Sequence, residues 1–227
     1  MKGTSTYLLT CPHCGATKLV ASSDNPWYKD DNAILWSDGR IDSAIWLDPA
    51  RVQQCPSCNH FYIRPSTSSL RKVAEPCEDT GHLPFHTLKQ AITELRSNKK
   101  EEKDAREETW WAYNILYKDV EENDIPDDDI EFNRTNMQWL LDYYVEEEPG
   151  FFCLKFELLR LLGYKKEYRE LLSDMTYERF AQWRRERYEK KGLQYILEDE
   201  ILKKRYLHRV QEYTAALDLP LKPYIMQ

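Results

Sequence analysis

Two short cysteine motifs constrain the fold of this chain more than any other feature. Residues 11–15 read Cys-Pro-His-Cys-Gly and residues 55–59 read Cys-Pro-Ser-Cys-Asn; we call them the first and the second knuckle. Two residues between the cysteines let the chain turn so that both thiolates face one ion. Gly15 and Asn59 follow the second cysteines, where a left-handed conformation is needed that these residue types tolerate. The two motifs therefore predict one shared metal site.

The predicted ligands are the thiolates of Cys11, Cys14, Cys55 and Cys58. Four thiolates make a closed tetrahedral site, and zinc is the metal that most often occupies such a site. We expect one structural Zn²⁺ ion, which has no open coordination position for a substrate. A module of about 60 residues is marginal from hydrophobic burial alone, so metal binding would supply folding free energy.

Other ligand-type side chains lie near these motifs. His13 and His60 adjoin the knuckles and could replace a cysteine, although four thiolates already complete a site. Three more follow in a polar segment: Cys77, His82 and His86. Their H-x3-H spacing could bind metal, but a second site lacks a fourth ligand, so we interpret them as chance residues of a linker. Cys153 lies in an apolar segment and is interpreted as a small core residue.

The pattern along the chain predicts three zones. Residues 1–64 contain turn residues and short runs typical of strands, such as YLLT and TKLVAS around the first knuckle and RVQQ and HFYIR around the second. Asp38-Gly39 lies between apolar runs and predicts a hairpin. Residues 65–83 are polar, with Ser, Pro and Gly, and are interpreted as a linker. Residues 84–227 have helical periodicity.

Helical periodicity is clearest in a few segments of the last zone. Phe85, Leu88, Ile92 and Leu95 recur at helical spacing and predict one buried face. Further helices are expected over 105–120, 136–145, 177–191 and 193–217. Residues 151–162 are apolar nearly all round, so this helix should be buried, and Gly163 should turn the chain into a second helix over 164–175. Thr176 is a candidate N-cap for the helix after it.

Residues 5–64, with a knuckle on each of two hairpins, resemble a zinc ribbon. Forty residues separate Cys14 from Cys55, more than in compact ribbons. This insert contains three tryptophans: Trp27, Trp36 and Trp46. They are expected to form a hydrophobic cover over the ribbon, with an exposed aromatic contact patch as the alternative.

The segment LKFELLRLLGYKKEYRELL, within residues 149–175, resembles the middle of a tetratricopeptide (TPR) repeat. The match covers one helical hairpin, and no second copy follows at the ~34-residue step of such repeats. The resemblance implies a TPR-like stack of helices. The combination of a zinc ribbon with a TPR-like helical domain, with WSDGR before the second knuckle, also resembles a group of bacterial proteins. This resemblance implies no activity. The expected fold class is α+β, a small β-rich zinc ribbon followed by a mostly α-helical, TPR-like domain.

Charge is distributed unevenly along the chain. Residues 83–148 carry eight basic and eighteen acidic side chains, and residues 149–227 carry sixteen basic and twelve acidic ones. An acidic middle zone disfavours general nucleic-acid binding. The basic aromatic segment QWRRERYEKK offers Arg184, Arg185 and Arg187 as possible phosphate contacts, but the interleaved glutamates also suit a solvated helix face.

These features favour an interaction protein. The sequence has no glycine-rich phosphate loop, no H-E-x-x-H, no nucleophile elbow and no His-x-Glu deaminase half-site, so an enzyme is not expected. No apolar run approaches the ~18 residues of a membrane span. The N-terminus does not read as a secretory signal, which predicts a cytoplasmic protein with reduced thiols. The expected partner is another protein, and nucleic acid is the alternative.

Overall fold

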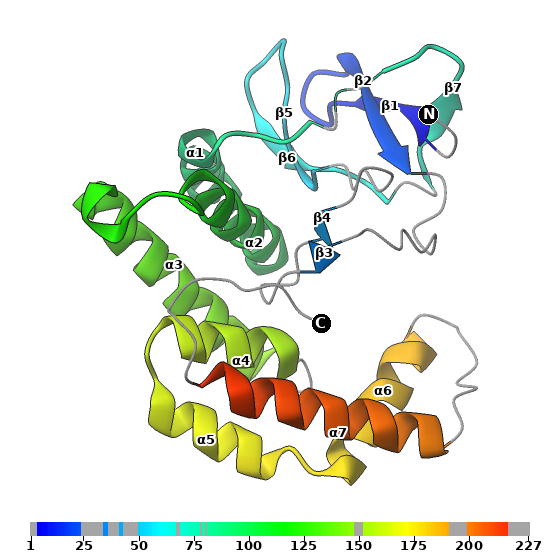
Figure 1. Ribbon diagram of the computed structural model, residues 1–227. Coiled ribbons are helices and arrows are strands. Elements are labelled where there is room, and N and C mark those ends of the chain that lie inside the picture. The colour runs from blue at the N-terminus through cyan, green and yellow to red at the C-terminus, as the bar shows by residue number, and fades with distance from the viewer. Residues whose placement is uncertain are drawn as a thin grey trace. The chain divides into compact units, whose positions relative to one another are not determined.

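The computed structural model describes residues 4–23, 34–35, 41–42, 50–66, 69–77, 79, 81–147, 152–190 and 199–217. The chain divides into two compact units, and the division falls between Asn136 and Met137. Unit 1 contains the strands and the first helices, and unit 2 contains the later helices (Figure 1). The layout confirms the predicted α+β class, with small antiparallel sheets followed by helices.

A three-stranded sheet carries the first knuckle in unit 1. Strands β1 (Thr4–Thr10) and β2 (Thr17–Ser23) pair antiparallel, with Thr10 opposite Thr17, so the knuckle forms the turn between them. Strand β7 (Arg71–Val73) pairs with the other edge of β1. Residues 71–73 lie in the stretch that the sequence suggested was a linker, and they instead complete this sheet.

Two further strand pairs belong to unit 1. Strands β5 (Val52–Gln54) and β6 (Phe61–Ile63) pair antiparallel and hold the second knuckle between them. Strands β3 (Ile34–Leu35) and β4 (Ile41–Asp42) also pair antiparallel, as expected for strands that flank a hairpin. The predicted Asp38-Gly39 turn lies outside the described residues, as do Trp27, Trp36 and Trp46.

Helices α1 (Phe85–Leu95) and α2 (Lys99–Leu116) follow the strands. The predicted face of α1 is confirmed, because Phe85, Leu88, Ile92 and Leu95 are all buried. Asn98 caps α2, and its side chain accepts hydrogen bonds from the backbone N–H groups of Lys100 and Glu101. This cap satisfies two amides that have no partner within the helix.

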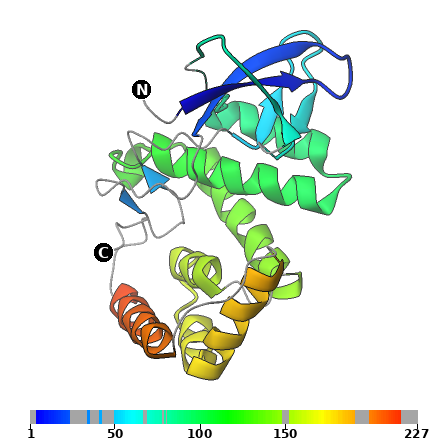
Figure 2. The same cartoon turned by 90° about the vertical axis from the view of Figure 1, so that its right-hand side faces the viewer.

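The second hairpin and the first two helices share one hydrophobic core. Val52 of β5 and Phe61 of β6 pack in the same cluster as Leu88, Ile92 and other residues of α1 and α2. Figures 1 and 2 both place α1 and α2 beside β5 and β6. The predicted domain boundaries at residues 64 and 84 concern independent folding and stay a prediction. Packing places residues from both sides of these boundaries in unit 1.

Helix α3 (Asp127–Glu146) spans the division between the two units and follows a short 3-10 helix (Glu122–Asp124). Three aspartates, Asp127–Asp129, occupy its first turn, where the helix dipole favours negative charge. Its first half packs in unit 1, where Asp129 accepts a hydrogen bond from the Tyr117 hydroxyl at 2.6 Å.

A helical hairpin opens the described part of unit 2 after α3. Helices α4 (Phe152–Leu161) and α5 (Lys165–Asp174) are joined through Gly163, which has φ of 75°. All residues from Leu154 to Arg160 are buried, which confirms the expectation from the all-round apolar pattern. Tyr168 of α5 packs its ring on Phe156 of α4, with 5.0 Å between the ring centroids.

Helices α6 (Tyr177–Lys190) and α7 (Asp199–Ala216) complete the described part of unit 2. Thr176 acts as the predicted cap, since its hydroxyl accepts a hydrogen bond from the Arg179 N–H at 3.3 Å. The hydroxyl of Tyr206 on α7 donates to the Met175 carbonyl at 2.9 Å, and Phe180 packs against the same tyrosine. None of the helices in the described ranges combines the length and hydropathy needed to cross a membrane.

Candidate metal centre

The four predicted cysteines come together in unit 1. The sulfur atoms of Cys11, Cys14, Cys55 and Cys58 all lie within 4.8 Å of one another. Contacts run between the two knuckles: Cys11 Sγ lies 3.8 Å from Cys58 Sγ, and Cys14 Sγ lies 3.5 Å from Cys55 Sγ. This arrangement confirms the prediction that both knuckles contribute to one cluster.

Both knuckles have the same backbone geometry. The N–H of Cys11 donates to the Ala16 carbonyl, and the N–H of Gly15 donates back to the Cys11 carbonyl. The second knuckle repeats this pattern, with Cys55 donating to His60 and Asn59 donating to Cys55. Gly15 and Asn59 have φ of 75° and 61°, the left-handed conformation expected from their residue types.

The thiols influence one another strongly. The pKa of Cys55 is lowered to about 6, because hydrogen bonding from the Cys58 backbone favours the thiolate more than burial disfavours it, and the Ser57 N–H adds to this effect. The pKa of Cys58 is raised to about 12: the His60 backbone lowers it, but burial and the neighbouring sulfurs outweigh that. Four thiolates this close repel one another, and a bound cation removes the repulsion.

The donor set fits one zinc ion. Four soft thiolates at mutual distances below 4.8 Å are the ligands of a closed tetrahedral site. Cys11 and Cys55 are buried, Cys58 is half-buried and Cys14 is exposed. The centre therefore lies at the surface of unit 1, with one knuckle cysteine open to solvent.

The two histidines beside the knuckles make other contacts. His60 Nδ1 lies 2.6 Å from Glu94 Oε1, and the His13 ring stacks on the His60 ring with 4.6 Å between centroids. Glu94 also accepts the Phe61 N–H at 3.1 Å, so this carboxylate ties the second hairpin to α1. Within the described ranges, the metal-capable group consists of the four cysteines, without either histidine.

The other ligand-type residues that the structure describes lie apart from the four-cysteine cluster. Cys77 Sγ donates to the Asp79 carbonyl at 3.8 Å, and His86 lies 4.0 Å from Asp129. Across the described part of the chain, Cys77, His82 and His86 form no metal-capable group. Their interpretation as chance residues of a linker stays a prediction. Cys153 lies in α4, and its side chain is outside the described residues.

The basic segment on α6 is only partly described. Arg185 is exposed, and the side chains of Arg184 and Arg187 lie outside the described residues. Near Arg185 on the same helix, exposed Gln182 donates a hydrogen bond to exposed Glu186 at 2.9 Å. The predicted nucleic-acid contact therefore stays a prediction.

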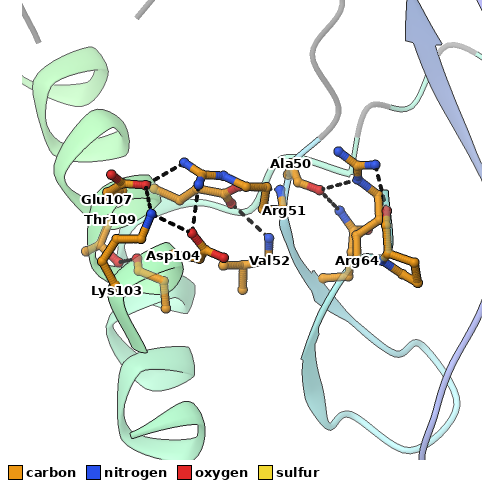
Figure 3. A network of polar contacts seen from close by, with 12 residues as sticks. Ala50, Arg51, Val52, Arg64, Lys103, Asp104, Glu107 and Thr109 are labelled. Atoms are coloured by element: carbon orange, nitrogen blue, oxygen red, sulfur yellow. Dashed lines mark hydrogen bonds and ion pairs between the residues drawn. The ribbon is translucent and has the colours of Figure 1, made fainter. Parts of the chain in front are cut away.

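Sequence reasoning missed a partly buried charge network that joins Arg51, the residue before β5, to α2 (Figure 3). The Arg51 guanidinium contacts Asp104 Oδ1 at 2.7 Å and Glu107 Oε2 at 2.6 Å. Lys103 contacts the same two carboxylates at 3.0 and 3.2 Å. Asp104 and Glu107 recur at helical spacing with Glu108 in KDAREE, which could have indicated one acidic face. Nothing local identifies Arg51 as the partner of that face.

Glu108 completes this network from the interior. It is buried, and its carboxylate accepts the backbone N–H groups of Arg51 and of Val52, the latter at 3.2 Å. Burial raises the pKa of Glu108 to about 7, although Arg51 and the two amides act in the opposite direction. Helix α2 thus supplies acceptors to the strand that leads into the second knuckle.

Comparison with known protein families, curated proteins and solved structures finds no match for the chain. The four-cysteine centre and the packing around it therefore carry the functional argument.

Proposed function

We propose that the chain is a zinc-stabilised scaffold of the cytoplasm that binds another protein, with a structural and not a catalytic zinc ion. The observation that carries this proposal is the position of the metal centre. Its four thiolates join two hairpins, and one of these hairpins shares a hydrophobic core with α1 and α2. A metal held in this way stabilises a framework, and a closed four-thiolate site offers no position for substrate.

Exposed apolar side chains support the proposal that the partner is a protein. Ile115 and Leu116, at the end of α2, are 50% and 47% exposed. Exposed acidic residues follow at Asp119 and Glu121. An apolar centre beside charged residues is typical of a protein interface. The TPR resemblance of the α4–α5 hairpin points in the same direction, because stacked helical hairpins commonly present peptide-binding surfaces.

The zinc content of the purified chain is the first test of this function. Elemental mass spectrometry of the purified chain should find one zinc ion per chain. A chain purified without any metal, and unable to take up Zn²⁺, would overturn the structural-zinc proposal.

To test for a protein partner, the tagged chain captures its partners from a lysate with and without nuclease. The wild type is compared with the double variant Ile115→Asp/Leu116→Asp. The matched control is Val145→Asp, which changes a side chain that is 57% exposed in unit 2. A defined partner that survives nuclease, survives the control change and is lost with the double variant supports the scaffold. Partners that disappear with nuclease would contradict it.

Nucleic-acid binding is the alternative, and exposed Arg185 in the basic last third favours it. Fluorescence anisotropy with labelled single-stranded and duplex oligonucleotides measures it directly. True phosphate contacts weaken steeply, by at least ~10-fold, between 50 and 200 mM salt. The variant Arg185→Glu should then lose affinity, whereas Lys166→Glu, at an exposed position on α5, should not.

A further inference from the structure

The two knuckles contact each other through cysteine pairs from different hairpins. Cys14 Sγ lies 3.5 Å from Cys55 Sγ, and Cys11 Sγ lies 3.8 Å from Cys58 Sγ. Each pair joins residues more than forty positions apart in the sequence. A disulfide formed within either pair would therefore hold the two hairpins together, as the metal does.

Access to the cluster is uneven. Cys14 is exposed, whereas its contact Cys55 is buried. Pro12, His13 and Gly15 around Cys14 are exposed as well. Cys14 is therefore the cluster cysteine that a small oxidant meets first from solvent, and Cys55 Sγ lies 3.5 Å from its sulfur across the knuckles. Thiolate oxidation follows exposure of the sulfur and the presence of a resolving cysteine beside it.

We propose that the cluster is a hydroperoxide-sensitive modification site, in which Cys14 is oxidised first and Cys55 resolves it into a disulfide between the knuckles. This proposal rests on the proposed metal site. In the first step the Cys14 thiolate attacks one oxygen of hydrogen peroxide. The O–O bond breaks, hydroxide leaves, and Cys14 becomes a sulfenic acid. In the second step the Cys55 thiolate attacks that sulfur, the S–S bond forms and a second hydroxide leaves. Two electrons pass from the two thiolates to one peroxide, and the ion loses two of its four ligands.

The packing explains why the fold would survive this change. The second hairpin keeps its core with α1, because Val52 and Phe61 are buried against Leu88 and Ile92 and the new disulfide replaces the link that the metal supplied. The first hairpin keeps its full β1–β2 pairing, from Thr4 opposite Ser23 to Thr10 opposite Thr17. Oxidation would then release the metal while both hairpins stay formed and covalently joined.

Tryptic peptides distinguish a disulfide between the knuckles from one within a knuckle, and fragmentation of a linked pair identifies which two cysteines it joins. Cys11 and Cys14 share the peptide between Lys2 and Lys18. Cys55 and Cys58 share the peptide between Arg51 and Arg71, because trypsin does not cleave the bond between Arg64 and Pro65. A disulfide between the knuckles links these two peptides. A disulfide inside a knuckle leaves them separate, each lighter by two hydrogen atoms.

The experiment uses the full reduced chain, with its zinc content measured beforehand. Hydrogen peroxide is added with the chromogenic chelator 4-(2-pyridylazo)resorcinol, remaining thiols are alkylated, and the peptides are mapped by mass spectrometry. We expect release of one zinc equivalent together with the linked peptide pair, and circular dichroism that keeps its helical signal. The variant Cys77→Ser, which removes a cysteine outside the cluster, should behave identically.

Three outcomes would overturn the inference. They are disulfides confined within the knuckles, zinc retained with reduced thiols at peroxide concentrations that oxidise free cysteine, and loss of the helical signal on oxidation. A chain without zinc at the outset identifies a failure of the metal proposal itself, whereas zinc present and then released with the wrong pairing identifies a failure of the disulfide proposal alone.

Discussion

Glu108 of α2 accepts the backbone N–H of Val52, the first residue of β5, at 3.2 Å. The same carboxylate accepts the N–H of Arg51. Both amides lie just before the second knuckle, so a side chain from the helical part of unit 1 positions the strand that leads into Cys55 and Cys58, two of the four clustered cysteines. The metal centre and α2 are therefore parts of one structural unit.

Replacing Glu108 should change how stability depends on pH. Burial raises the pKa of this carboxyl to about 7 from an ordinary value of 4.5. A raised pKa in the folded state favours folding below the unfolded pKa, and this contribution is lost as the pH rises through about 7. Glu108→Gln stays neutral, so the wild type should lose on the order of 3 kcal/mol relative to the variant between pH 4.5 and pH 8.

Urea unfolding of both proteins at several pH values, in buffer with zinc, measures this difference. Metal binding also weakens in acid, but it does so in both proteins, so their difference isolates Glu108. Glu170→Gln, at an exposed position on α5, should follow the wild-type curve. Parallel stability curves for the wild type and Glu108→Gln would contradict the assignment.

Arg51→Ala should destabilise the chain. The change leaves Asp104, Glu107 and Glu108 with less positive charge around them, and an uncompensated buried charge is costly. About a third of the Arg51 side chain contacts water, so we expect a loss of about 2 kcal/mol and not the full effect of a buried pair. Arg179→Ala removes an exposed ion pair with Asp174 and should cost less than about 0.5 kcal/mol. Urea unfolding measures both losses, and equal unfolding midpoints for Arg51→Ala and Arg179→Ala would refute the stabilising role of Arg51.

Loss of the metal should affect the two units differently. Cys55→Ser removes a ligand next to the core that β5 and β6 share with α1 and α2. We expect amide hydrogen exchange to rise in both hairpins and in α1, while α4 and α5 keep the protection of the wild type. Treatment of the wild type with a strong zinc chelator should give the same map. Increased exchange throughout α4 and α5 would show that the units do not unfold separately.

A left-handed glycine at the first knuckle gives a further test. Gly15 has φ of 75° with no atom within 4 Å of an added Cβ, so Gly15→Ala introduces backbone strain without a clash. The expected cost is roughly 1 kcal/mol, seen as about 5-fold weaker zinc binding in a chelator competition. Gly163 has the same φ and the same open space in unit 2. Gly163→Ala should lower overall stability but leave zinc affinity unchanged, and equal zinc affinities for all three proteins would rule out the strain argument.

Tyr168→Phe tests the core of unit 2. The Tyr168 hydroxyl donates to the Tyr213 carbonyl at 2.7 Å in a fully buried position. Removing the hydroxyl leaves that carbonyl with one hydrogen bond fewer, at a cost of about 1–2 kcal/mol. Tyr164→Phe removes a hydroxyl that contacts Gln138 in a partly buried position and should cost less. Thermal unfolding of both variants compares the two costs, and a larger effect at Tyr164 would be the contrary result.

The sequence by itself determined the features that depend on neighbouring residues. The knuckle spacing, the left-handed residues Gly15 and Asn59 and the buried helix around Phe156 were all predicted, because turn conformation and helix faces are encoded over a few positions. The four-cysteine cluster was also predictable, since two matching motifs imply a common ion.

Only the tertiary structure decided which faces meet. It brought Arg51 to Asp104 and Glu107, more than fifty residues away, and it placed Val52 and Phe61 in the core of α1 and α2. It also placed residues 71–73, within the stretch interpreted as a linker, at an edge of the β1 sheet. Local periodicity identifies an apolar or charged face, whereas its partner depends on shape and charge complementarity between segments distant in the chain.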